Sequence, residues 1–254
     1  MTEQEYIPVS RFIDSLDSCF SRNDMKAAGE CIRSWESEAR RLHDNRGLLT
    51  VLNEAVGYYR RVKKKTRALE AMEESLRLVD ELELTNTLSG ATFYINAATT
   101  LSFFGSKEQA LELYGKAALC FMAGNHTACY EYAALLNNRA ATLYELKRYN
   151  EAEADWLAAI DTLKGIGMHD GEIAVSLIML AHLTYDRNED SAEKVEALLD
   201  EAWDFINSEN QPKDGNYAYI LRKCAPSLEY FKRPDEAQAC RDVAREIYEE
   251  NREQ

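Results

Sequence analysis

The only cluster of cysteine and histidine side chains in the sequence is Cys120-x5-His126-x2-Cys129. Thiolates and imidazoles at short spacing are typical zinc ligands, but a structural zinc site normally uses four of them. This cluster offers three, and the apolar residues around Cys120 favour a buried thiol near a helix end. The sequence therefore predicts no metal site here.

Side chains that could catalyse a reaction form no recognisable motif. His43, His169 and His182 have no serine, cysteine or acidic companion at a motif spacing, and no glycine-rich phosphate loop is present. The short run 165–167, Gly-Ile-Gly, is better interpreted as a helix C-cap and linker. We therefore expect no catalytic residues, no cofactor and no enzymatic activity.

Asparagines recur at a spacing that suggests binding. Asn96 and Asn138 lie 42 residues apart, and Asn53 and Asn137 fall one position earlier in their own segments. A side-chain amide offers one acceptor and two donors, which is what the backbone of an extended peptide needs from a groove wall. The alternative is that these amides cap turns or bond neighbouring helices. Which interpretation holds depends on where the helices that carry these asparagines place them.

The composition predicts helices. The chain has 254 residues, of which 46% are hydrophobic, with only 4 prolines and 11 glycines. That apolar fraction is enough for a sizeable core, and the frequent Ala, Leu and Glu residues favour helix. The first expectation is an all-α protein.

Charge and hydropathy exclude several classes of function. The net charge of −14 disfavours binding to nucleic acid or to anionic lipid. No stretch reaches the roughly 20 apolar residues of a membrane span, and residues 1–8 lack the pattern of a secretion signal. The six cysteines show no paired short spacing and are expected to be reduced thiols. We therefore expect a cytoplasmic protein that binds neither nucleic acid nor membrane.

A repeat of 42 residues organises the chain. Second amphipathic runs open on Ala68, Ala110 and Ala152, each 42 residues after the previous one. Each opening alanine is followed at +4 by a large residue and at +7 by a small one, namely Met72 and Ser75, Tyr114 and Ala117, Trp156 and Ala159. These positions share one helical face, so the stripe lets a neighbouring helix approach closely.

The same stripe recurs less regularly towards the end of the chain, as Val195-Leu199-Ala202 and as Ala237-Arg241-Ala244. A divergent first unit precedes the regular ones. We therefore expect one repeat domain over residues 1–254, built from six units at approximately 8–46, 48–86, 90–130, 132–170, 174–210 and 215–252.

Further positions share a pattern with a known repeat. The residue twelve before each opening position is small and the residue nine before it is Tyr or Leu, as in Val56 and Tyr59, Ala98 and Leu101, Ala140 and Leu143, Ala225 and Leu228. Together with the alanine stripe, this resembles the tetratricopeptide repeat (TPR), most closely over residues 139–160. The period exceeds the usual length of about 34 residues and is similar to the extended repeats of kinesin light chains and Gram-positive peptide receptors. The resemblance implies a right-handed α-solenoid of about six antiparallel helix pairs, a TPR-like superhelix.

Three features depart from the pattern after residue 185. Pro226 falls inside the first helix of the last unit, where it should kink or break that helix. Residues 186–191 make the fifth turn longer than the others. Arg241 occupies the large apolar position of the last stripe, which suggests a capping unit with a polar outer face.

The resemblance implies that the first helix of each pair lines a concave groove. The inward-facing candidates are Asn53, Arg60, Asn96, Asn137, Asn138, Tyr144, His182, Tyr219, Arg222 and Lys223. By the same resemblance, the four asparagines would hold a peptide backbone. Arg222 with Lys223 could pair with a ligand carboxylate, although ordinary helix-surface charge is the alternative.

The resulting hypothesis is a non-catalytic scaffold that binds a protein or peptide segment in its groove. One alternative is a self-assembling structural protein in which the terminal units join two copies as a homodimer. Another is a peptide-sensing module that lacks an output domain. No helix-turn-helix precedes the repeats, which argues against direct DNA binding.

Overall fold

The chain folds into helices joined by short turns. The computed structural model describes residues 5–167, 169–187 and 191–253, and in these ranges it contains helices and no strands. The helices are α1 (Val9–Ser21), α2 (Met25–Arg41), α3 (Asn45–Arg61), α4 (Lys65–Glu81), α5 (Leu88–Phe103), α6 (Lys107–Ala123), α7 (Tyr130–Glu145), α8 (Tyr149–Ile166), α9 (Asp170–Arg187), α10 (Ala192–Ile206), α11 (Gly215–Tyr230) and α12 (Pro234–Glu253). The predicted all-α solenoid of helix pairs is confirmed.

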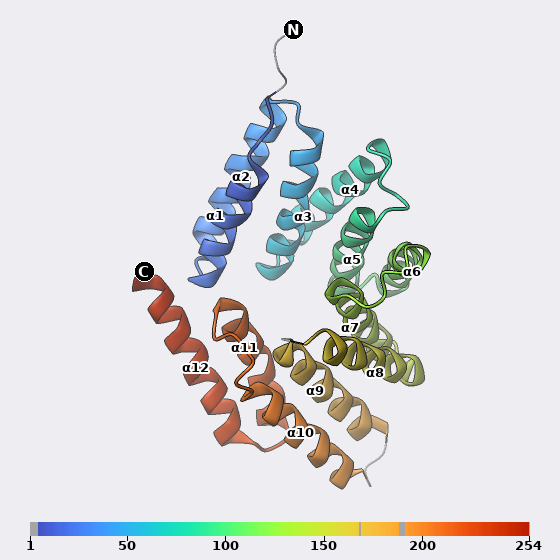
Figure 1. The fold of residues 1–254 in the computed structure, drawn as a ribbon, viewed down its shortest axis with the longest axis vertical. Coiled ribbons are helices and arrows are strands. Elements are labelled where there is room, and N and C mark those ends of the chain that lie inside the picture. Colours follow the sequence, from blue (N-terminus) through green and yellow to red (C-terminus); the bar gives the residue numbers. More distant parts are fainter. Residues whose placement is uncertain (1–4, 168, 188–190, 254) are drawn as a thin grey trace. The chain divides into compact units, whose positions relative to one another are not determined.

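The helices fall into two compact units (Figure 1). Unit 1 spans Met1–Asn125 and holds α1–α6, and unit 2 spans His126–Gln254 and holds α7–α12. That the six repeats form a single domain stays a prediction.

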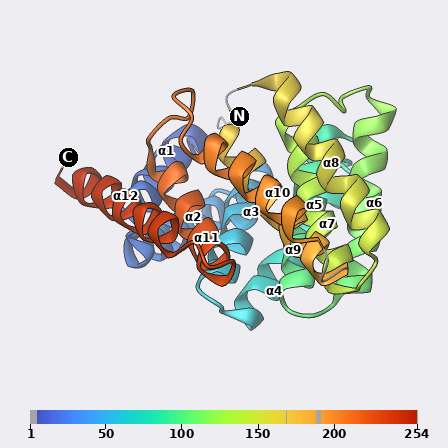
Figure 2. The same ribbon diagram turned by 90° about the horizontal axis from the view of Figure 1, so that it is seen from below.

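Within each unit the helices form two layers. Odd-numbered helices, the first of each pair, contact one another: α3 packs on α1 and α5 in unit 1, and α9 packs on α7 and α11 in unit 2. Each even-numbered helix packs on its own first helix, and α2, α4 and α8 also contact the next one. We call α1, α3 and α5 the first-helix layer of unit 1, and α7, α9 and α11 that of unit 2. Figure 2 shows α11 and α12 side by side, as Figure 1 does.

The predicted alanine stripe forms the contact between paired helices. Ala68, Ala110 and Ala152 are fully buried, and so are the large residues Tyr114 and Trp156 that follow them. A methyl group at the opening position allows close approach, and the large residue then fills the space between the helices. The last stripe departs as expected, because Arg241 is partly exposed there and pairs with Glu229 across 3.1 Å.

The turns inside the three regular pairs repeat one backbone conformation. Lys63, Gly105 and Lys147, each 42 residues after the last, have positive φ angles of 56°, 98° and 59°. In the turn at Lys147, the backbone N–H of Arg148 donates to the carbonyl of Leu143 at 2.9 Å. This bond ends the first helix and turns the chain into the second.

Pro226 does not break its helix. Helix α11 continues from Gly215 to Tyr230 with Pro226 inside it, so of the predicted kink or break, the break is wrong and the kink stays a prediction. Pro226 is exposed, and so is Arg222, whose carbonyl lies four residues earlier and loses its usual donor. Water can bond the Arg222 carbonyl at that surface, so the missing donor costs little. The packing of α11 on α12 then keeps the helix intact. The long fifth turn predicted at residues 186–191 lies partly outside the described residues.

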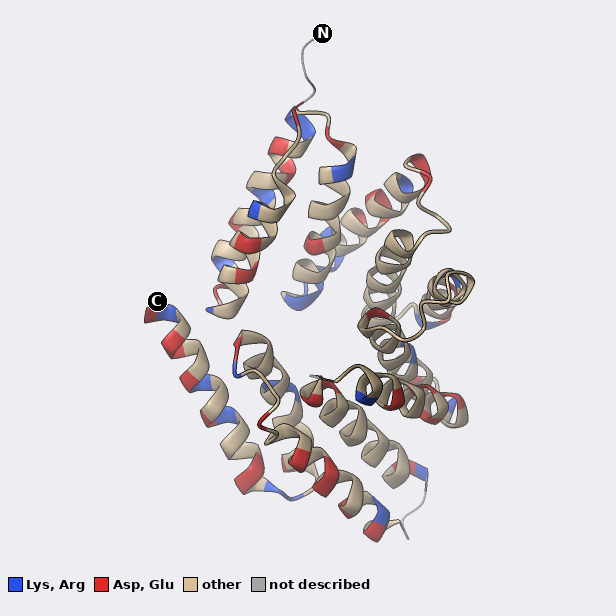
Figure 3. Ribbon diagram, viewed as in Figure 1, with Lys and Arg blue, Asp and Glu red and all other residues tan. Residues whose placement is uncertain are grey.

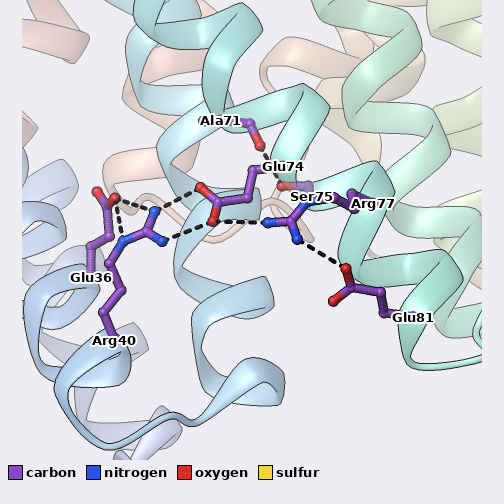
Figure 4. A network of polar contacts seen from close by, with 7 residues as sticks. All are labelled: Glu36, Arg40, Ala71, Glu74, Ser75, Arg77 and Glu81. Carbon is purple, nitrogen blue, oxygen red and sulfur yellow. Dashed lines mark hydrogen bonds and ion pairs between the residues drawn. The ribbon is translucent and has the colours of Figure 1, made fainter.

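Ion pairs link the second helices of unit 1 (Figure 4). Glu74 of α4 lies 2.6 Å from Arg40 of α2, which also pairs with Glu36 at 2.8 Å. Arg77 extends the network to Glu81 at 2.9 Å. Figure 3 shows the contrast with α5, which carries no charged residue. No helix in the described ranges has the length and apolarity to span a bilayer.

Candidate peptide-binding face

Two of the predicted asparagines bond each other in unit 1. The Nδ2 atom of Asn96 on α5 donates to Oδ1 of Asn53 on α3 at 2.8 Å. Asn53 in turn donates to Glu54 at 3.3 Å. Burial raises the pKa of Glu54, and the bond from Asn53 partly opposes that shift. These amides therefore join neighbouring helices, which is the alternative that the sequence left open.

Arg60 also reaches across the first-helix layer of unit 1. Its Nη1 atom donates to Oγ1 of Thr100 at 3.0 Å and lies 3.5 Å from the backbone oxygen of Asn96. The guanidinium of α3 thus holds α5 beside it, so a side chain predicted to line the groove links two first helices.

The two asparagines of α7 differ from each other. Asn137 accepts a hydrogen bond from Oγ of Ser176 on α9 at 2.7 Å, so it links adjacent first helices as Asn53 and Asn96 do. The neighbouring Asn138 is half-buried, and its side chain makes no hydrogen bond to any described residue. Of the four asparagines, Asn138 alone keeps its full amide capacity.

Tyr144 and Asp186 form the next link in unit 2. The hydroxyl of Tyr144 on α7 donates to Oδ2 of Asp186 on α9 at 2.5 Å. Burial first, and the nearby carboxylate second, raise the pKa of Tyr144, because both disfavour a phenolate. Tyr144 therefore stays a hydrogen-bond donor at neutral pH.

His182 lies between α9 and α11. Its Nε2 atom is 3.0 Å from Oγ of Ser227, and its ring centroid is 4.6 Å from that of Phe231 and 5.2 Å from that of Tyr230. Burial lowers the pKa of His182, because the cation would lose hydration among these rings. The imidazole is therefore a neutral packing and hydrogen-bonding group.

The three candidates on α11 are all exposed, but they have different neighbours. Nζ of Lys223 lies 5.8 Å from the ring centroid of Tyr219, within cation–π range. Arg222 instead lines a pocket with residues of α12. The structure thus separates the two basic residues that the sequence grouped as one carboxylate partner.

The cysteine and histidine cluster is not assembled into a ligand set. Cys120 is buried and its thiol lies 3.5 Å from the backbone oxygen of Thr85, whereas the thiol of Cys129 faces the backbone oxygen of His126 at 3.2 Å. No group of three potential metal ligands comes together in the described part of the chain.

Sequence reasoning missed the exposed aromatic residues of the first helices. In the described helices every exposed aromatic side chain lies on a first helix: Phe103, Tyr130, Tyr185, Tyr219 and Tyr230. Only Tyr219 was a sequence candidate. A signal existed, because Phe103 and Tyr230 both fall seven residues before the opening alanine of their repeat.

Comparisons with known proteins bear on the fold. No protein-family model matches the sequence, and no curated protein is significantly similar to it. Among solved structures, the nearly identical TPR-like repeats of a kinesin-light-chain-type protein from Podosopora anserina share 14% identity at a TM-score of 0.55, covering 78% of this chain and 94% of that one.

Two Rap proteins are similar over almost the whole chain. Apo RapI shares 13% identity at a TM-score of 0.61, covering 98% of this chain and 100% of that one. A Rap protein complexed with competence and sporulation factor shares 17% identity at a TM-score of 0.57, with 96% and 74% covered. The chain therefore has the all-α, TPR-like repeat fold that these structures share.

Proposed function

We propose that the first-helix layer binds a peptide or an extended protein segment without catalysing a reaction. The observation that carries this proposal is the confinement of exposed aromatic side chains on the described helices to first helices. Aromatic side chains dominate binding energy in protein interfaces, because they bury a large area at a low cost in conformational entropy.

Unit 2 offers the fuller set of binding groups. Its first helices present Tyr185, Tyr219 and Tyr230 together with Asn138, whose side-chain amide bonds none of the described residues. An amide that is half-buried and uncommitted can bond both the N–H and the C=O of a peptide backbone. The aromatic rings would then hold side chains that flank that backbone.

The structural neighbours support a binding role. One of them was crystallised as a Rap protein complexed with competence and sporulation factor. A repeat fold of this kind presents one helix layer as a continuous surface within each unit, and solenoids use such surfaces for binding.

Affinity measurements on single variants test the proposal. Peptides selected from a random display library against the wild-type protein would be measured by fluorescence anisotropy. We expect Asn138→Ala and Tyr219→Ala each to weaken binding by about tenfold, equivalent to about 1.4 kcal/mol.

The matched control is Leu157→Ala, which removes a side chain that is 50% exposed on the second helix α8. It should change affinity by less than about twofold, because it lies outside the first-helix layer. Equal losses in all three variants, or losses only in the control, would refute the proposal.

A further inference from the structure

A pocket rich in arginine lies between α11 and α12. Its volume is about 240 Å³, and its charged lining consists of Arg222 of α11 and, from α12, Arg241, Arg245, Arg252 and Glu249. We call it the α11–α12 arginine pocket. Four arginines against one glutamate is an unusual balance in a chain with a net charge of −14.

The spacing on α12 explains how the arginines come together. Arg241, Arg245, Tyr248 and Arg252 follow one another at intervals of four, three and four residues, which places them on one face of the helix. In Figure 3 basic segments recur along α12. The sequence thus builds a basic stripe with one aromatic residue in it.

The arginines of the pocket differ in their ion pairs. Arg241 pairs with Glu229 at 3.1 Å, and Arg245 pairs with Asp242 at 2.8 Å. Arg222 forms no ion pair or side-chain hydrogen bond with any residue that the structure describes. One guanidinium with its full set of donors therefore borders the pocket.

Tyr248 supplies a second unused donor. Its side chain lines the same pocket and is only 5% exposed, yet its hydroxyl is the one buried side-chain polar atom in the described ranges without a hydrogen-bond partner. A buried polar group left without a partner is destabilising, so it calls for an explanation. A bound group that accepts a hydrogen bond provides one.

We propose that the α11–α12 arginine pocket binds a carboxylate of an acidic peptide segment. The guanidinium of Arg222 pairs with the carboxylate oxygens, and the hydroxyl of Tyr248, which solvent does not reach in the free protein, donates to one of them once the ligand moves the side chains that cover it. Among the described residues, Arg222 is the guanidinium of this pocket that lacks a partner, and its single charge matches a monoanion. The nearby Glu249 repels a doubly charged phosphate more strongly than a single carboxylate. This site lies partly on a second helix, so it does not rest on the proposed role of the first-helix layer.

A short blocked oligoglutamate peptide is the probe, with the matching oligoglutamine peptide as its uncharged counterpart. Fluorescence anisotropy at low salt should detect binding of the first and not of the second. We expect Arg222→Gln to weaken oligoglutamate binding by at least about tenfold. Tyr248→Phe should weaken it by about threefold or more without lowering the melting temperature, because the lost hydroxyl bonds no described residue of the free protein.

The control is Arg67→Gln, which removes the same charge from an exposed site on α4. It should leave binding within about twofold of the wild type, because Arg67 does not line the pocket and its charge is exposed to solvent. Absence of oligoglutamate binding, equal losses in Arg222→Gln and Arg67→Gln, or displacement of the peptide by low concentrations of inorganic phosphate would overturn the proposal.

Discussion

Polar side chains on the first helices have two different roles: some bond a neighbouring helix, and others keep their hydrogen-bonding groups available for a ligand. Asn96 donates a hydrogen bond to Asn53, and Asn137 accepts one from Ser176. The side chain of Asn138 makes no hydrogen bond to any described residue. The repeat spacing alone could not show this, because a partner some forty residues away is set by how two helices are rotated against each other.

Substitution of these asparagines should separate structural from binding amides. We expect Asn96→Ala to lower the free energy of unfolding by about 1 kcal/mol, because it leaves the half-buried Oδ1 of Asn53 without its donor. Asn138→Ala should change it by less than about 0.5 kcal/mol. Urea denaturation monitored by circular dichroism measures both. A larger loss in Asn138→Ala than in Asn96→Ala would contradict this assignment.

At the scale of elements, the sequence predicted the helices well where a buried stripe defined them. Ala110 with Tyr114, and Ala152 with Trp156, are buried as their spacing requires. The break predicted as one outcome at Pro226 is absent, because the packing of α11 on α12 outweighs the local effect of proline on the backbone. Tertiary packing, which a local rule does not contain, decides such cases.

The ion pairs between α2 and α4 should make the stability of unit 1 depend on pH. The hydrogen bond from Arg40 lowers the pKa of Glu74 below its ordinary value of 4.5. Stabilisation by Glu74 is therefore complete above pH 4.5 and is lost as the pH falls through the lowered pKa. We expect Glu74→Gln to cost about 1 kcal/mol at pH 7 and progressively less in acid.

Chemical denaturation of both proteins across this pH range measures the difference. Glu70→Gln is the control, because Glu70 and Arg67 are both well exposed and lie 3.5 Å apart. Exposed pairs of this kind contribute little. If the difference in the free energy of unfolding between wild type and Glu74→Gln stays constant with pH, the network does not stabilise unit 1 through the charge of Glu74.

For the molecule as a whole, the 42-residue period was enough to predict an all-α repeat fold. It could not predict where contacts divide the chain, which the structure places after Asn125. Nor could it identify the α11–α12 arginine pocket, although the spacing of Arg241, Arg245 and Arg252 was visible. The pocket needs Arg222 from α11 beside that stripe, and only the packing of the two helices brings them together.

Hydrogen–deuterium exchange with and without a selected peptide shows whether the first-helix layer is the surface that binds it. Unit 2 is the informative part, because its first helices carry Asn138 and the exposed tyrosines. We expect slower exchange in α7, α9 and α11 when the peptide binds, and unchanged exchange in α8 and α10. Protection confined to α8 and α10 would contradict it.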